Sequence, residues 1–115
     1  MILGRVIGEV WATQRDPRLE RQKLLVVRPH AVMEPAFGSR HLIATDNLDA
    51  GVGDDVVVCL GAPARWSAGG NDMPVDAAVL GVVDRVELAL GALTPAGAAP
   101  GIARPLRLPH GEGGR

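Results

Sequence analysis

The run from Pro74 to Glu87 is apolar on both of the faces that alternate along a β-strand. One parity carries Val75, Ala77, Val79 and Val83, and the other carries Ala78, Leu80, Val82 and Val86. A strand with one wet face alternates apolar and polar residues, whereas two-sided burial is typical of parallel strands covered by helices. This chain has too little helical sequence to cover both faces. We therefore predict that one face of the strand lies in the protein's own core and the other contacts a neighbouring subunit.

Length and charge narrow the class of protein. A chain of 115 residues with a net charge of −1 fits one domain with a modest core, and its charge does not favour nucleic acid or an anionic membrane as a partner. The single Cys59 excludes an intrachain disulfide and fits a reducing cytosol. We find no signal-peptide pattern and no apolar stretch of about 18 residues. The expectation is a soluble, cytoplasmic protein.

A change in composition near Gly91 predicts the domain boundary. Residues 91–115 hold six of the 15 glycines and four of the nine prolines, so this segment cannot sustain a strand ladder. We predict a β-barrel domain over 1–90 and a disordered, dispensable tail over 91–115. The alternative is a docking peptide built on Ile102, Leu106 and Leu108.

The first ninety residues have the pattern of five strands separated by turn signals, with one helical turn at Ala62–Trp66 that starts with Pro63. In the first strand, Gly4 and Gly8 lie on the inward parity, which indicates a close backbone approach of the kind that small barrels require. The expected fold is all-β, a five-stranded OB-like Greek-key barrel. The five strands are expected at 1–13, 24–28, 41–45, 56–60 and 74–87.

Side chains that could carry chemistry are few and scattered. The three histidines have no metal-ligand spacing, and Cys59 stands in an apolar run that predicts a buried, inert thiol. The glycine-rich stretch 49–53 lacks the Lys-Ser/Thr of a phosphate loop. We therefore predict no enzyme activity and no catalytic, cofactor or metal site. Nucleic-acid binding is not expected either, because stacking needs more aromatics than Trp11, Phe37 and Trp66.

Two features of the sequence point to contact with another protein. Trp66 follows Arg65 at the end of the predicted helical turn, and these two residue types are enriched at interface hot spots. Asp76 interrupts the apolar fifth strand, as expected of a salt bridge or hydrogen bond between subunits. We therefore name Trp66, Asp76 and Val79 as candidate interface residues. An exposed arginine, a half-buried tryptophan and an exposed strand end remain the alternative interpretation.

Four segments together resemble the pentameric vertex proteins of bacterial microcompartment shells, the EutN/CcmL family. They follow one another in the family's order and spacing across residues 1–88, and the tail lies outside the resemblance. Three departures occur: Arg21 and Asp49 stand where the family has glycine, and Ala62-Pro63 stands where it often has two serines. The four segments are Gly4–Val10, Leu19–Val27, Asp46–Gly53 and Pro74–Asp84.

The resemblance implies a structural protein. Five copies would close into a homopentamer that caps a shell vertex beside hexameric and pseudohexameric shell proteins, inside the bacterial cytoplasm. It also implies that the segment made of Gly61, Ala62, Pro63, Ala64 and Arg65 lies near the fivefold axis and lines any central opening. The alternative function is a small OB-like module that binds nucleic acid, a peptide or a small ligand.

Overall fold

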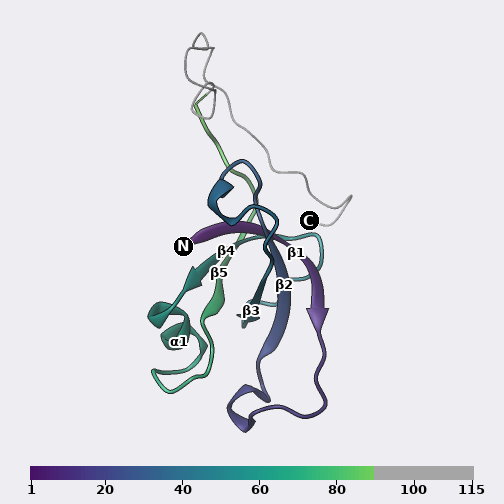
Figure 1. Cartoon of the computed structure of the whole chain (residues 1–115), viewed down its shortest axis with the longest axis vertical. Helices are drawn as coiled ribbons and strands as arrows, with labels where there is room; N and C mark the ends of the chain where they lie inside the picture. Colours follow the sequence, from purple (N-terminus) through teal and green to yellow (C-terminus); the bar gives the residue numbers. More distant parts are fainter. Residues whose placement is uncertain (90–115) are drawn as a thin grey trace.

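The computed structural model describes residues 1–89, which form a small β-barrel with one helix on its outside (Figure 1). The strands are short, and two single 3-10 turns lie in the connections. In chain order the elements are β1 (Ile2–Val10), η1 (Pro17–Leu19), β2 (Lys23–Pro29), η2 (Pro35–Phe37), β3 (Leu42–Asp46), β4 (Asp55–Leu60), α1 (Ala62–Ala68) and β5 (Ala77–Val83).

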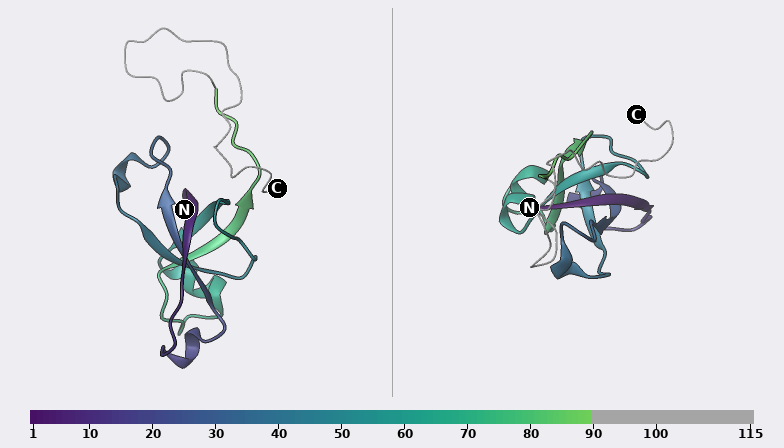
Figure 2. Two further views of the ribbon diagram at one scale, coloured as in Figure 1. Left: turned by 90° about the vertical axis from the view of Figure 1, so that its right-hand side faces the viewer. Right: turned by 90° about the horizontal axis from the view of Figure 1, so that it is seen from above.

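The five strands close into a barrel in the order β1-β2-β3-β5-β4, with β4 returning to pair with β1. All neighbours are antiparallel except β3 and β5, which run parallel through the pair Thr45 and Ala78. This confirms the predicted five-stranded barrel with a short helix between the fourth and fifth strands. The two ends of the barrel differ, because α1 lies at one end and η2 lies beyond the other (Figures 1 and 2).

The inward parity of β1 is confirmed for Ile2, Gly4 and Val6, but it is wrong at Gly8, which lies opposite the outward-facing Val26. Ile2 and Val6 are buried in the main core, and Gly4 lies so close to β2 that a Cβ there would meet Val27 Cγ1 at 2.6 Å. Only a residue without a side chain permits that approach. The pairing of β1 with β2 shifts by one residue between Val6 and Gly8, and the extra residue, Ile7, is exposed.

β5 is shorter than the predicted run, and a register shift rather than burial of both faces explains its apolar residues on both parities. The strand spans Ala77–Val83, and its pairing with β4 shifts so that Leu80 is an extra residue. An extra residue reverses the alternation of faces, so Val79 and Val82 both pack on the main core although their parities differ. The apolar residues on both parities therefore do not mark two separate buried faces along the whole strand.

α1 covers the other face of β5 at its start. Ala64 packs with Cys59 and Ala78 in a second buried cluster, so the face that we expected a neighbour to cover is covered here by the chain's own helix. Ala64 and Ala68 are four residues apart and lie on the same helix face, which explains why both are buried. The helix extends two residues beyond the predicted end.

The backbone accommodates Arg21 and Asp49, the two residues that stand where the family has glycine. Asp49 adopts φ of +60°, the left-handed region that aspartate tolerates, and it is the one non-glycine residue of 1–89 with positive φ. Arg21 therefore needs no glycine-like backbone. The loop that contains Asp49 is held by the buried Asp46, whose carboxylate accepts hydrogen bonds from Leu48 N at 3.1 Å and Ala50 N at 2.8 Å.

Candidate functional site

The segment Gly61–Arg65 connects β4 to the first turn of α1 and is fixed to the start of β5. Gly61 N donates to the Asp76 carbonyl oxygen at 2.8 Å, which brings two of the candidate sites together. Gly61 has φ of +72°, so the chain can turn sharply out of β4 into the helix. No side chain caps the helix at this end.

Only part of this segment presents side chains to solvent. Ala62 and Pro63 are exposed, Arg65 is partly exposed, and Ala64 is fully buried on the face of α1 that packs on the strands. The exposed atoms at the tip of the segment are therefore those of small, compact side chains and of the backbone. Compact side chains with exposed backbone groups were predicted here from the sequence, and Ala62 and Pro63 have them. Ala64 instead packs in the interior between α1 and the strands.

The three candidate interface residues lie in different environments. Trp66 is 67% exposed on the outer side of α1, and Asp76 is exposed just before β5. Val79, by contrast, is 4% exposed and belongs to the main core, so its side chain has no surface to offer a neighbour. The exposed apolar residue of this strand is Leu80, at 42%.

Several other large apolar side chains are exposed, and most were not singled out by the sequence. Ile7 carried a usable signal, because it shares the outward parity of Arg5 and Glu9. Ile43 lies opposite Val26 on the outside of the β2–β3 pair. The exposed set comprises Met1, Ile7, Trp11, Val32, Ile43, Leu48, Val52, Trp66 and Leu80.

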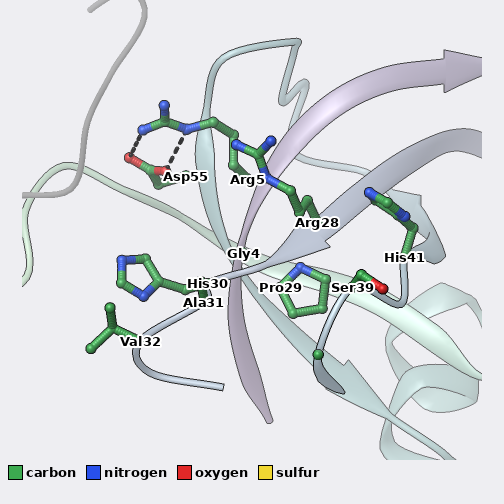
Figure 3. A pocket seen from close by; sticks show the side chains of 11 residues that line it. Gly4, Arg5, Arg28, Pro29, His30, Ala31, Val32, Ser39, His41 and Asp55 are labelled. Carbon is green, nitrogen blue, oxygen red and sulfur yellow. Dashed lines mark hydrogen bonds and ion pairs between the residues drawn. The ribbon is translucent and has the colours of Figure 1, made fainter. Parts of the chain in front are cut away.

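A cavity of about 450 Å³ lies at the end of the barrel that is remote from α1 (Figure 3). Arg5 and Asp55 form a two-bond ion pair in its wall, with Arg5 Nε at 3.0 Å from Asp55 Oδ1 and Arg5 Nη2 at 3.2 Å from Asp55 Oδ2. Sequence reasoning did not find this cavity, because its lining comes from four separate stretches of the chain, and Arg5 and Asp55 alone are 50 positions apart. The lining is Gly4, Arg5, Arg28, Pro29, His30, Ala31, Val32, Gly38, Ser39, His41 and Asp55.

Within residues 1–89, no three histidine, cysteine, aspartate or glutamate side chains gather as a metal site would require. Cys59 is buried, as its apolar surroundings in the sequence predicted. Among the same residues, no helix has the length and apolar character needed to span a membrane.

Among the carboxyl groups of residues 1–89, that of Asp16 has a clearly altered pKa. The pKa of Asp16 is lowered from 3.8 to about 2, chiefly because its carboxylate accepts a hydrogen bond from the Arg18 side chain and another from the Arg18 backbone. Arg18 also donates to the Asp72 carbonyl oxygen at 2.9 Å, so it links η1 to the connection between α1 and β5. Gln22 Nε2 reinforces this link by donating to Ala68 O at 3.0 Å.

Comparison with known proteins gives a consistent result over the barrel. Residues 1–84 match the family described as ethanolamine utilisation protein EutN/carboxysome. A bacterial microcompartment shell vertex protein, GrpN of Rhodospirillum rubrum, is 41% identical over 87 residues, which are 76% of this chain and 97% of the relative. The carboxysome shell vertex protein CcmL of Synechocystis sp. is 37% identical over 93 residues, covering 81% and 92% of the two chains.

A solved structure agrees with these sequence matches. The GrpN pentameric microcompartment shell protein from Rhodospirillum rubrum superposes with a TM-score of 0.64 at 38% identity, covering 76% of this chain and all of the other. The family match ends at residue 84, so residues 91–115 lie outside it.

Proposed function

The chain belongs to the ethanolamine utilisation protein EutN/carboxysome family, and from this premise we propose that five copies form a ring that caps a vertex of a bacterial microcompartment shell. One observation carries this proposal. Relatives named as shell vertex proteins match the barrel over nearly their whole length, and one of them is a pentamer. The role is structural, since these relatives are named as shell components.

A ring with fivefold symmetry needs two different surfaces on each subunit, one for each neighbour. The barrel has exposed apolar side chains on its outside although its core is already closed. We place Leu80 and Asp76 at the contact between subunits, with Leu80 taking the role that the sequence analysis gave to Val79. Trp66, a large exposed side chain on α1, then serves as an anchor for a neighbouring subunit or for an adjoining shell protein.

The finer parts of the proposal concern partners and place. Hexameric and pseudohexameric shell proteins would surround the ring, and the shell would lie in the bacterial cytoplasm. Within the ring, the segment Gly61–Arg65 would line the axis. Support for this comes from the compact, exposed tips of Ala62 and Pro63, which allow five copies to approach one another closely. Backbone groups would supply most of the polarity of such an opening, with no N–H from Pro63.

The oligomeric state tests the main proposal. Size-exclusion chromatography with light scattering at micromolar concentration should give a mass of about 60 kDa, five times the 12.0 kDa of the chain. A mass of one chain would contradict the proposal and favour the small OB-like binding module instead.

Disulfide crosslinking tests the axial placement separately. In a Cys59→Ala background, Ala62→Cys should form disulfides between subunits under mild oxidation, because residues near an axis approach their own copies. The matched control is Val32→Cys, an exposed position at the other end of the barrel, which should stay uncrosslinked. An intact ring in which Ala62→Cys also stays monomeric on a non-reducing gel would contradict the axial placement but not the ring.

A further inference from the structure

The cavity at the end of the barrel opposite α1 has an excess of hydrogen-bond donors. Across three adjacent strands, Arg28 lies opposite Arg5, and Arg5 lies opposite Asp55. Asp55 is buried and is held by two bonds from Arg5. Two arginines directly opposite each other repel, and among residues 1–89 no hydrogen bond or ion pair to Arg28 is found.

The loop that carries η2 adds further donors from the other walls. His30 Nδ1 accepts a hydrogen bond from Met33 N at 3.0 Å, so in the neutral imidazole the proton lies on Nε2, which is a donor. His41 lines the cavity from the far side, next to Ser39, whose hydroxyl can also donate (Figure 3). His30 and His41 thus flank the space on opposite sides of Arg28.

The acceptors of the cavity do not balance these donors. Asp55 is the one acidic residue among the lining residues, and its carboxylate already accepts both bonds of Arg5. The rest of the lining is glycine or apolar, from Gly4 in the floor to Pro29, Ala31 and Val32. At about 450 Å³ the space is in the range of small-molecule sites, and larger than a single water-sized defect.

We propose that this cavity binds a small oxyanion of the phosphate class, either inorganic phosphate or the phosphoryl group of a small metabolite. Arginine is suited to such a group because its planar guanidinium donates two parallel hydrogen bonds to two oxygens. Arg28 supplies that fork, while His30 Nε2, His41 and the Ser39 hydroxyl approach the remaining oxygens. The site lies within one chain, so this inference does not depend on the ring.

Titration of the full chain with inorganic phosphate tests the site. At constant ionic strength, isothermal titration calorimetry should give saturable binding of one phosphate per chain. Two or three charge-assisted bonds predict a dissociation constant on the order of 1 mM. Sulfate should compete, while chloride at the same ionic strength should not. The amide NMR signals of Gly38 and Ser39 should shift with the same saturation.

Substitutions at and beside the cavity separate a site from general attraction to positive charge. Arg28→Gln should weaken phosphate binding at least tenfold, because a tenfold loss of affinity corresponds to about one hydrogen bond to a charged group. Arg28→Lys keeps the charge but loses the planar fork and should weaken binding less. The control is Arg40→Gln, which removes one charge from the same loop but does not line the cavity.

Two results would overturn the proposal. One is the absence of saturable binding up to about 20 mM phosphate, well beyond the expected dissociation constant. The other is an equal loss of affinity in Arg28→Gln and Arg40→Gln, which would mean that net charge alone attracts the anion. Light scattering on each variant shows whether assembly has changed, so failure of this site and failure of the ring are distinguishable.

Discussion

Two parts of the outer barrel surface lie side by side on β5 and differ in what covers them. Ala78, near the start of the strand, is 2% exposed because α1 packs over it, whereas Leu80, two residues later, is 42% exposed. Both belong to the same apolar run in the sequence. The difference shows that apolar residues on the outer parity of one strand can be either covered by the chain's own helix or left exposed.

The helix can cover only a small part of that surface. Seven residues rise about 10 Å along the axis, and α1 approaches the sheet through the small side chains Cys59, Ala64 and Ala78. These small side chains let the helix pack closely on the strands. They do not extend over the rest of the outer face, which stays exposed. The open part is what an assembling protein would offer to a neighbour.

The largest expected effect comes from placing one charge on the part of β5 that α1 covers and, in a second variant, one charge on the exposed part. Ala78→Asp buries a carboxylate without a partner and should lower the free energy of unfolding by about 3–5 kcal/mol. Leu80→Asp places the same charge where it can reach water, so the barrel should keep its circular dichroism spectrum while the ring dissociates. Thermal unfolding and light scattering of both variants measure the two effects. Equal loss of folded protein in both would remove the distinction between the two surfaces.

A volume change under the helix should have the next largest effect. Ala64→Leu overfills the second cluster and should cost about 1–3 kcal/mol in chemical denaturation. Ser67→Leu makes a similar change on an exposed position of the same helix and should alter the free energy of unfolding by less than about 0.5 kcal/mol. If Ala64→Leu were equally neutral, α1 would not be packed as described.

Removal of the tail tests whether the chain itself covers the exposed apolar surface of the barrel. Residues 91–115 lie outside the described residues, and the sequence predicts that they are dispensable for the fold. Truncation after Leu90 should therefore shift the melting temperature by less than about 4 °C and leave the ring intact. A larger loss would mean that the tail packs on the barrel and covers part of the surface that we assign to a partner.

The smallest effect is expected at the polar links that tie η1 to the end of α1. Arg18→Gln should return the pKa of Asp16 from about 2 toward 3.8, measurable by NMR titration of the carboxyl carbon. Because the pKa of Asp16 is lowered in the folded protein, any stabilisation from this pair is present above about pH 4 and is lost as the pH falls toward 2.

The pair of Asp16 and Arg18 is exposed, so near neutral pH its removal should hardly change the melting temperature. A large drop in melting temperature for Arg18→Gln would show that the helix is held by these links rather than by packing at Ala64.

The alternation and turn signals of the sequence were enough to predict five strands, one short helix and an OB-like Greek-key barrel, while its full closure is seen in the structure. The glycine at position 4 was identified correctly as a point of close approach, since a strand parity and a missing side chain are both local properties. Trp66 and Asp76 are both exposed, and their assignment to a contact between subunits stays a prediction. These features depend on residues near one another along the chain.

Three features depended on the tertiary structure. The extra residue at Leu80 reverses the faces of β5, and a register shift is a property of two paired strands rather than of one. It places Val82 against the same core as Val79, although the two residues have different parities in the sequence. The burial of Ala78 required α1 to fold back on the sheet. The cavity required Arg5, Arg28 and Asp55 to meet across three strands, and no local pattern records which charges a barrel brings together when it closes.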